Sequence, residues 1–526
     1  MVIALFGQTT NPNAMLIYFL LRMGISSTRK AFGRESMAQN IFLRREGERQ
    51  YVIQEKSSEV GDGEFLLLRP NYLASEPEDI PAGMTNVKRP GRFLTAAVGD
   101  GISDDTSAIQ AIVNHAASSK NNKVFFPRGE YLVSSNIAIP GPVELHGTQS
   151  GIAVIKSSTP YVFQVYNASP VKSVSLNNVY FDGIRVNFDG GVNREVPGPT
   201  AMSNVTINSC VFFSSGRPTP RNAEREQLEM MDLRNSNVYR NIFLRDSNAY
   251  GVASKFTFTV GVEVRENICG LDLGKIGWLA TKVEPAWYWR DQKQKLEFLM
   301  THYNLESDQG FFQSCCYEEC DERMRIVKNI FNGSPNTGRF RDHVMYLKGF
   351  NMMEVVSNYV RGWPADYSGG IKARNGKNLL VARNYLDDTG IFLYTHRTIN
   401  PCLFNGLKNV VIYRNHIVQR TNPGHLTSGI YYYEPHDIGI DWNITYSANV
   451  FEILGVSDPT NYICIWLTNG DLSQHHVLQD NVYYGTKMPV KLYADDSTPL
   501  HETEKNNDSI TNWYNYPLYK LNIPPY

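Results

Sequence analysis

Short runs of alternating apolar and polar residues recur along most of this chain, and an asparagine interrupts each of them. Two examples are the segments 381–386 and 411–417, in which the asparagine separates two apolar stretches. Alternation with a period of two residues is typical of β-strands that have one buried face. The pattern therefore predicts many short strands, joined by tight polar turns.

The asparagines of these runs are spaced almost regularly. Successive members lie 26 to 34 residues apart, except for one gap of 62 residues between Asn267 and Asn329. A period of this length predicts a solenoid, in which each Asn adopts the left-handed turn conformation and its amide bonds to the next rung. The series comprises Asn178, Asn208, Asn241, Asn267, Asn329, Asn358, Asn384, Asn415, Asn449 and Asn481.

The repeat divides the chain into a central domain and two flanking parts. We expect a β-helix domain over residues 91–485, with an insertion near 271–324 that fills the double-length gap. Residues 1–90, rich in proline towards their end, are expected to form an attachment or oligomerisation module. Residues 486–526 lose the repeat and are expected to form a C-terminal cap or trimerising tail.

The insertion is rich in aromatic residues, which are followed by a helix-like stretch, residues 292–303. Two interpretations stay open: the excursion walls a substrate groove, or it is a structural loop. Its large aromatic residues are Trp278, Trp287, Tyr288 and Trp289.

Charge and hydropathy exclude two classes of partner. The chain has 51 basic and 52 acidic residues, so neither a nucleic-acid-binding patch nor an acidic solvating tail is indicated. The apolar run 14–21 is too short to span a bilayer, and it lacks the basic region and the cleavage site of a signal peptide. We therefore expect no nucleic-acid partner and no membrane insertion.

The cysteines do not indicate a disulfide framework, because there are seven of them in 526 residues. Cys315, Cys316 and Cys320 cluster, but without a second pair or nearby histidines their spacing is a weak zinc signal. Packed or surface free thiols are the simpler interpretation, and they favour assembly in a reducing cytoplasm. We expect no metal and no cofactor.

One segment predicts how the solenoid begins. Residues 98–112 contain an Asp-rich turn followed by a helical apolar pattern, and residues 124–133 predict two strands around a Pro-x-Gly turn. Such a helix is expected to cover the open end of a solenoid, where strand edges are otherwise unpaired. The capping aspartates and the apolar helix positions are Asp100, Asp104, Asp105, Ile109, Ile112 and Val113.

This segment resembles the N-terminal cap of the pectate-lyase-like superfamily. The motif reads GDGxxDDTxAIQ followed by VxxPxGxY, within residues 98–133. That superfamily holds polysaccharide lyases, glycoside hydrolases and many bacteriophage tailspike depolymerases. The resemblance therefore implies an all-β fold, a right-handed single-stranded parallel β-helix, that acts on a polysaccharide. The motif is specific for the fold and not for the reaction.

Aligning the rungs by their asparagines brings five strands into register: residues 343–349, 370–374, 390–396, 429–433 and 462–467. Their alternate apolar residues are expected to face inward. Rungs lie about 4.8 Å apart, so the outward residues would form one continuous stripe. Its aromatic rings could stack on sugars and its cations could pair with acidic groups. The alternative is an ordinary solvated face, which such a density of aromatic residues disfavours. The outward residues are Tyr346, Lys348, Lys372, Arg374, Phe392, Tyr394, His396, Tyr431, Tyr433, Tyr462 and Trp466.

One mechanism for this stripe is β-elimination. Lys372 would be the base, its positive charge disfavoured by Arg374 and Lys348, and Arg374 would neutralise a uronate carboxylate. Tyr394 or His396 would protonate the leaving oxygen. The segment around Lys372 is similar to the alginate and chondroitin lyases of this fold, although Tyr394 and His396 stand where those lyases carry an Arg, and their calcium-binding acids have no counterpart. The other stripe residues would bind the glycan.

A hydrolase mechanism would use aspartates that precede the aligned strands, namely Asp342, Asp366 and the pair Asp387–Asp388. Asp366 and Asp388 are the catalytic candidates, because acids on nearby rungs reach the roughly 5 Å or 6.5–9.5 Å separations of retaining and inverting pairs. Aspartates are also common in turns for backbone reasons. The polygalacturonase motif set is absent.

Two histidine positions are expected to be structural. His343 lies on the inward phase of its strand, which predicts a hydrogen-bonded core histidine. The pair His475–His476 lacks further ligands at metal spacing and is expected on the surface.

The resemblance and the stripe together favour a homotrimeric, tailspike-like depolymerase of a bacterial capsule, O-antigen or exopolysaccharide. Residues 1–90 would attach it to a virion tail or baseplate, after assembly in the host cytoplasm. Two alternatives remain: a non-catalytic glycan-binding adhesin or structural virion component, and a secreted bacterial polysaccharide lyase or epimerase. The sequence names neither the glycan nor the host, nor whether the groove lies within one chain or between chains.

Overall fold

A computed structural model describes most of residues 81–492, together with three strands nearer the N-terminus. The aromatic residues expected in the insertion, Asp342, Asp366, His475 and the tail after residue 492 lie outside the described residues. The gaps within 81–492 are residues 150–151, 160–162, 192–201, 214–225, 245–251, 271–294, 296–298, 300–313, 333–342, 363–368, 397–403, 421–427, 434–441, 455–461, 469–475 and 487.

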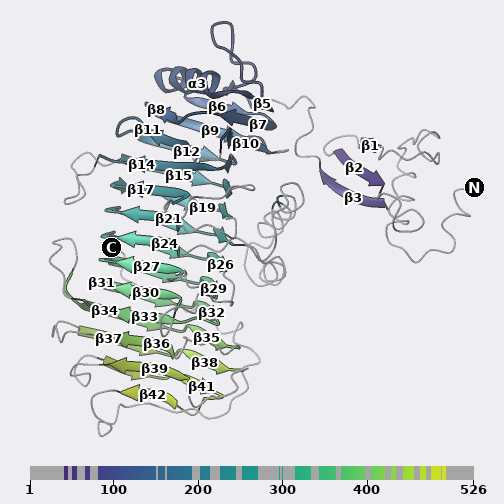
Figure 1. Ribbon diagram of the computed structural model, residues 1–526. Helices are drawn as coiled ribbons and strands as arrows, with labels where there is room; N and C mark the ends of the chain where they lie inside the picture. Colours follow the sequence, from purple (N-terminus) through teal and green to yellow (C-terminus); the bar gives the residue numbers. More distant parts are fainter. Residues whose placement is uncertain are drawn as a thin grey trace, which may run out of the picture.

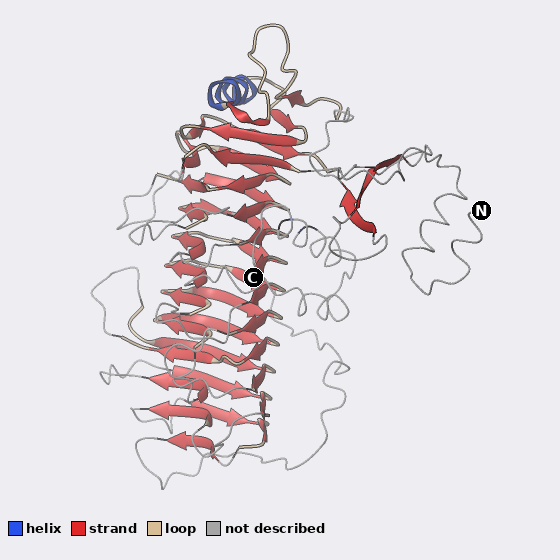
Figure 2. Ribbon diagram, turned by 45° about the vertical axis from the view of Figure 1, so that its right-hand side comes forward, coloured by secondary structure: helices blue, strands red, loops and turns tan. Residues whose placement is uncertain are grey.

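From Thr85 to Leu492 the chain forms successive turns, or rungs, that stack along one axis and build three long parallel sheets (Figures 1 and 2). Each turn contributes one strand to each sheet, and these strands pair in parallel with the corresponding strands of the turns above and below. The fold is therefore a right-handed parallel β-helix, as the repeat and the cap motif predicted.

The 13-stranded sheet consists, in spatial order, of β5 (Asp100–Asp104), β7 (Gly129–Val133), β10 (Ala153–Ser157), β13 (Tyr180–Asp182), β16 (Val211–Phe213), β20 (Ile242–Phe243), β23 (Ile268–Cys269), β26 (Ile330–Asn332), β29 (Tyr359–Arg361), β32 (Tyr385–Asp387), β35 (His416–Gln419), β38 (Val450–Ile453) and β41 (Val482–Tyr484).

The 12-stranded sheet consists of β8 (Ile137–Ile139), β11 (Phe163–Asn167), β14 (Ile184–Asp189), β17 (Leu228–Met231), β21 (Val252–Thr257), β24 (Ser314–Glu319), β27 (Met345–Lys348), β30 (Ile371–Arg374), β33 (Ile391–Tyr394), β36 (Ser428–Tyr433), β39 (Ile463–Thr468) and β42 (Met488–Leu492).

The 14-stranded sheet consists of β4 (Thr85–Asn86), β6 (Lys123–Phe126), β9 (Val143–Gly147), β12 (Lys172–Asn177), β15 (Met202–Asn208), β18 (Leu233–Arg234), β19 (Asn237–Tyr239), β22 (Glu263–Arg265), β25 (Arg325–Val327), β28 (Asn351–Val356), β31 (Gly376–Ala382), β34 (Leu407–Tyr413), β37 (Trp442–Ser447) and β40 (His476–Gln479). A separate antiparallel sheet holds β1 (Ile41–Arg44), β2 (Gln50–Glu55) and β3 (Phe65–Pro70).

The β-helix is longer than the expected range 91–485. It already includes β4, which pairs with β6, and it continues to β42, which pairs with β39. The excursion in the double-length gap is shorter than expected, because β24 pairs in parallel with both β21 and β27. Residues 314–324 therefore belong to the β-helix.

The N-terminal end of the helix is covered as the motif predicted. Helix α3 (Thr106–Ser118) buries Ile109, Ile112 and Val113 against β6, β8 and β9 (Figure 2). The expected cap is corrected in one respect. The Asp105 carboxylate accepts no helix N–H and instead accepts the backbone N–H groups of Val98 and Gly99, at 2.6 and 2.9 Å. It fixes the glycine-rich loop in front of the helix.

A ladder of buried asparagine side chains runs down one corner of the helix. Each amide before the last, that of Asn481, donates to the Oδ1 atom of the next asparagine and to a backbone carbonyl of the preceding rung, as at Asn358, with distances of 3.0 and 2.9 Å. The rung-to-rung amide bonds are therefore confirmed. Within the described part of the chain the ladder contains eight members, Asn241, Asn267, Asn329, Asn358, Asn384, Asn415, Asn449 and Asn481.

Two details of the predicted ladder are wrong. Asn178 and Asn208 are not members, because Val179 and Cys210 hold the equivalent position; the backbone N–H of Cys210 donates to Asn241 Oδ1 at 2.9 Å. The left-handed residue is also not the ladder asparagine but the residue before it, which is Ser357 (φ 58°) in front of Asn358. The asparagine is selected for its amide and not for its backbone conformation.

Candidate functional site

The five strands aligned from the sequence, β27, β30, β33, β36 and β39, are neighbours in the 12-stranded sheet. Their inward residues lie in the core as predicted; Met345, Leu347, Ile371 and Ala373 have no exposed surface. The outward residues form two columns that we call the stripe: Tyr346, Lys372, Phe392, Tyr431 and Trp466 in the first, and Lys348, Arg374, Tyr394 and Tyr433 in the second.

Lys372 is enclosed by three aromatic rings of the stripe. Its Nζ atom lies 5.1 Å from the ring centres of Tyr346 and Phe392, and 5.2 Å from that of Tyr394. Ring faces attract a cation, and the attraction grows as water is excluded. The three rings therefore hold the ammonium group of Lys372 on the outer face of β30, and its role as base stays a prediction.

Arg374 and Tyr394 lie directly opposite each other on β30 and β33. Arg374 Nη1 donates to the Tyr346 hydroxyl at 3.0 Å, and its guanidinium lies 5.6 Å from the ring centre of Tyr394. Burial raises the pKa of the Tyr394 phenol, and Arg374 partly opposes this. Tyr394 is consequently a neutral phenol at pH 7, able to give up a proton beside a cation.

Lys348 differs from the sequence expectation, because its charge is compensated. Its ammonium group forms an ion pair with Glu319, the residue opposite it on β24. It therefore adds little positive potential at Lys372. Sequence reasoning missed Glu319, and also Tyr317, whose ring lies 5.2 Å from that of Tyr346. Both residues lie on β24, which falls within the 62-residue gap of the asparagine series and was therefore not aligned with the other strands.

Three outward-phase rings are covered and do not present a face for a sugar. Phe392 and Tyr431 are each 4% exposed and stack on one another at 5.1 Å, and Tyr462 is 3% exposed within the core cluster. The expectation of direct glycan contact is thus corrected for them. Tyr431 supports Trp466, whose ring lies 5.0 Å away. Tyr346, Tyr394, Tyr433 and Trp466 are half-buried and remain accessible.

The two histidines beside the stripe differ in character. His343 is fully buried and its Nδ1 atom lies 3.3 Å from the Gly369 carbonyl oxygen; burial, and then Lys372, hold its pKa well below the ordinary value. This agrees with the hydrogen-bonded core histidine expected there. His396 is half-buried, and its ring centre lies 6.0 Å from that of Tyr394. His476 was expected on the surface but is 5% exposed, and its Nδ1 atom lies 3.2 Å from the Tyr446 hydroxyl.

The carboxylates proposed for hydrolysis do not form an open acid pair among the described residues. Asp388 is 3% exposed, has φ 53°, and its Oδ1 atom accepts the backbone N–H of Arg420 at 2.7 Å. Asp387 accepts Arg420 Nε at 2.9 Å. Asp388 therefore has the geometry of a turn aspartate, whereas Asp387 ends β32 and is held in an ion pair with Arg420. Asp366 lies outside the described residues, so its role stays a prediction.

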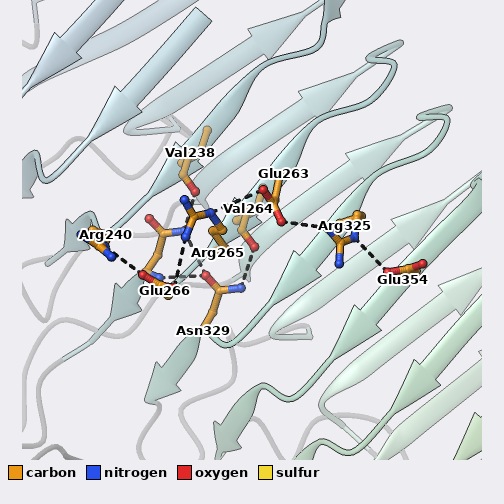
Figure 3. Close-up of polar contacts among 10 residues, drawn as sticks. Val238, Arg240, Glu263, Val264, Arg265, Glu266, Arg325, Asn329 and Glu354 are labelled. Carbon is orange, nitrogen blue, oxygen red and sulfur yellow. Dashed lines mark hydrogen bonds and ion pairs between the residues drawn. The ribbon is translucent and has the colours of Figure 1, made fainter. Parts of the chain in front are cut away.

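An outer face of the 14-stranded sheet shows what a solvated surface of this helix looks like (Figure 3). There Arg325 bridges Glu263 and Glu354 at 3.0 and 2.9 Å, and Arg240 pairs with Glu266 at 2.8 Å. The charges alternate from rung to rung and neutralise each other. The stripe differs because aromatic rings surround its cations Lys372 and Arg374, which favours ligand binding over simple solvation.

The cysteines have the character of packed thiols. Cys315 and Cys316 are fully buried, and burial raises the pKa of both thiols well above the ordinary value. Within the described part of the chain, no group of three or more potential metal ligands is found. None of the described helical segments has the length and apolar character that a bilayer span requires.

Two carboxyl groups are buried under the N-terminal edge of the stripe. Glu318 points into the core between the inward residues of β21 and β27, and its two oxygens accept the backbone N–H groups of Asp321 and Lys348, at 2.7 and 2.6 Å. Asp321 is 1% exposed, and its Oδ2 atom has no hydrogen-bond partner. Burial, and then the charge of Asp321, raises the pKa of Glu318 well above its ordinary value. Burial raises the pKa of Asp321 to about 8.

Asp321→Asn is expected to stabilise the protein at pH 8 by about 2 kcal/mol. The folded pKa of Asp321 is raised, so its favourable contribution is complete below pH 4 and is lost as the pH rises to about 8. The amide removes this loss while Oδ1 still accepts the Thr259 N–H. Urea unfolding at pH 5 and pH 8 measures the difference.

Glu318→Gln is the control for that measurement. Both Glu318 oxygens accept N–H groups, so an amide nitrogen would face a donor and destabilise the fold at either pH. If Asp321→Asn loses as much stability as the wild type between pH 5 and pH 8, Asp321 is not the titrating group.

The chain matches one family model over residues 86–263, described as rhamnogalacturonase A/epimerase, pectate lyase-like. The match starts in β4 and includes the cap motif at residues 98–133. The pectate-lyase-like resemblance inferred from that motif is thereby confirmed. Residues beyond 263 complete the same β-helix, as their strand pairing shows.

Individual relatives are distant. The mannuronan C5-epimerase AlgE1 of Azotobacter vinelandii is 32% identical over 120 residues, which is 19% of this chain and 8% of the epimerase. The solved surface adhesin PfbA of Streptococcus pneumoniae is 13% identical, with a TM-score of 0.42 and coverage of 77% of this chain and 93% of the adhesin. Tailspike protein 3 of bacteriophage CBA120 is 10% identical, with a TM-score of 0.40 and coverage of 93% and 79%. At these identities the similarity concerns the fold alone.

Proposed function

Since residues 86–263 match a pectate-lyase-like family model on a parallel β-helix, we propose that this chain is a tailspike-like depolymerase. It binds an acidic bacterial surface polysaccharide along the stripe and cleaves it by β-elimination. The observation that carries the proposal is the juxtaposition of Lys372, Arg374 and Tyr394 on neighbouring strands. Two cations and a neutral phenol supply the charge stabilisation and the acid that elimination from a uronate requires, and His396, with its ring centre 6.0 Å from that of Tyr394, supplies the base.

Each residue has one step in this reaction. Arg374 and Lys372 pair with the uronate carboxylate and stabilise the negative charge that develops when the C5–H bond breaks. His396 accepts that proton. The C4–O bond then breaks, a C4=C5 double bond forms, and the leaving oxygen takes the phenolic proton of Tyr394. Tyr433 and Trp466 stack on flanking sugars.

The wider biological setting is part of the proposal and rests on the resemblance. The chain forms a homotrimer on a virion tail or baseplate, attached through residues 1–90. A monomeric mass by light scattering at micromolar concentration contradicts this assembly. An extracellular bacterial lyase or epimerase with the same stripe is the alternative setting, and it is compatible with the sequence match to an epimerase.

A panel of bacterial capsular, O-antigen and exopolysaccharides tests the reaction. We expect ultraviolet absorbance from an unsaturated uronate together with new reducing ends on at least one uronate-containing polymer. New reducing ends without absorbance indicate hydrolysis and return attention to Asp366. Neither signal on a glycan that the protein binds indicates a non-catalytic adhesin and contradicts the proposal.

A further inference from the structure

We propose that Asn375 is a positioning residue of the stripe, whose side-chain amide fixes the backbone of His396 and so holds its ring beside Tyr394, the residue opposite Arg374. This inference rests on the proposed function, because it names the residue that holds the acid Tyr394 and the base His396 in a fixed arrangement. Asn375 follows β30 directly, and His396 lies two residues beyond the last residue of β33.

The contacts of Asn375 replace a piece of regular strand pairing. Pairing between β30 and β33 ends at Arg374 and Tyr394. Beyond that point Asn375 Oδ1 accepts the His396 N–H at 2.9 Å, and Asn375 Nδ2 donates to the His396 carbonyl oxygen at 2.6 Å. The Asn375 backbone N–H donates to the Tyr394 carbonyl oxygen at 3.3 Å. One residue thus holds the backbone on which both rings are mounted.

The backbone conformation explains why this position takes asparagine. Asn375 has φ 51°, a left-handed conformation that favours glycine and tolerates asparagine. Glycine would adopt the same conformation without either side-chain bond, and aspartate would keep the acceptor but lose the donor. Asn375 is also fully buried, so water does not replace lost bonds readily. Asn375→Gly therefore removes the two bonds without adding backbone strain.

The chain contains a matched control for that substitution. Asn378 has φ 58°, but its amide takes part in an outer ladder on the 14-stranded sheet, where Asn409 Nδ2 donates to Asn378 Oδ1 at 2.9 Å. Asn378 follows Asn375 closely in the sequence and has no bond to His396 or Tyr394 among its contacts on that ladder. Asn378→Gly makes the same chemical change at the same kind of φ, away from the stripe.

The first test reads His396 without needing a substrate. Histidine is labelled with ¹³C in the full chain, and the His396 ring signal is identified by its loss in His396→Gln. We expect the signal to shift and broaden in Asn375→Gly and to stay unchanged in Asn378→Gly. An unchanged His396 signal in Asn375→Gly overturns the proposal. Asn375→Asp serves if the glycine variant does not fold, with a smaller change in the same signal expected.

The second test is kinetic, on the glycan that the wild type cleaves. In Asn375→Gly we expect kcat to fall about tenfold and KM to stay within about twofold, because Lys372 and Arg374 still bind the carboxylate. Asn378→Gly should leave both unchanged. A changed His396 signal with an unchanged kcat overturns the positioning role. A changed signal in a protein that cleaves no glycan contradicts the proposed function but leaves the structural tie intact.

Discussion

Tyr394→Phe is expected to lower kcat on the cleaved glycan at least about a hundredfold, with little change in affinity. The phenol is the proposed acid for the leaving oxygen, and burial holds its pKa above the ordinary value, so it is protonated at pH 7. Phenylalanine keeps the ring that encloses Lys372 and stacks 5.9 Å from Tyr433. The loss should therefore appear in kcat and not in KM.

Tyr385→Phe is the matched control for this prediction. Tyr385 is also an outward tyrosine whose pKa is raised by burial, but it lies on the 13-stranded sheet and its hydroxyl accepts Arg420 Nη2 at 2.9 Å. Removal of the Tyr385 hydroxyl should leave kcat within about threefold of the wild-type value. If Tyr394→Phe is as active as Tyr385→Phe, the proton comes from another group, and His396 becomes the first candidate.

Asn358→Ala is expected to lower the free energy of unfolding by about 3 kcal/mol. The side chain is 1% exposed and sits in the middle of the buried ladder. It donates to the Ile326 carbonyl oxygen and to Asn384 Oδ1, and its own Oδ1 accepts both the backbone and the side-chain N–H groups of Asn329. Alanine leaves these buried groups without partners, and equilibrium urea unfolding measures the cost.

Asn409→Gly is the comparison for the buried ladder. Asn409 belongs to the outer asparagine ladder, has φ 54°, and is exposed to water that replaces its bonds. We expect it to cost less than about 1 kcal/mol. If Asn358→Ala and Asn409→Gly lower the free energy of unfolding equally, the buried amide bonds stabilise the fold no more than the exposed ones.

The sequence predicted the solenoid because its period survives in the asparagines, but it did not predict the register of the ladder. Asn178 has φ 54° and occupies the left-handed position that Arg240 holds two rungs later, in front of Asn241. A shift of one residue is invisible in a pattern of Asn spacing, because both positions accept asparagine. Only the hydrogen bonds distinguish an amide chosen for its partners from one chosen for its φ.

The site was predicted in outline by strand alternation, which placed Lys372, Arg374 and Tyr394 on one outward face. Alternation gives direction but not exposure, and so it could not show that Phe392 and Tyr431 are covered by neighbouring rings. It also could not pair Lys348 with Glu319, since the excursion separates β24 from the rungs that the asparagines aligned. Asn375 was missed because its role depends on two side-chain bonds across rungs.

The most direct test of the stripe compares product release by two arginine variants on a glycan that the wild type cleaves. Arg374→Ala removes a half-buried stripe cation beside Tyr394, and Arg420→Ala removes a more exposed arginine directly after β35 of the 13-stranded sheet. We expect Arg374→Ala to abolish unsaturated product, while Arg420→Ala retains it in proportion to its folded fraction. Full activity of folded Arg374→Ala would contradict the stripe as the site of the reaction.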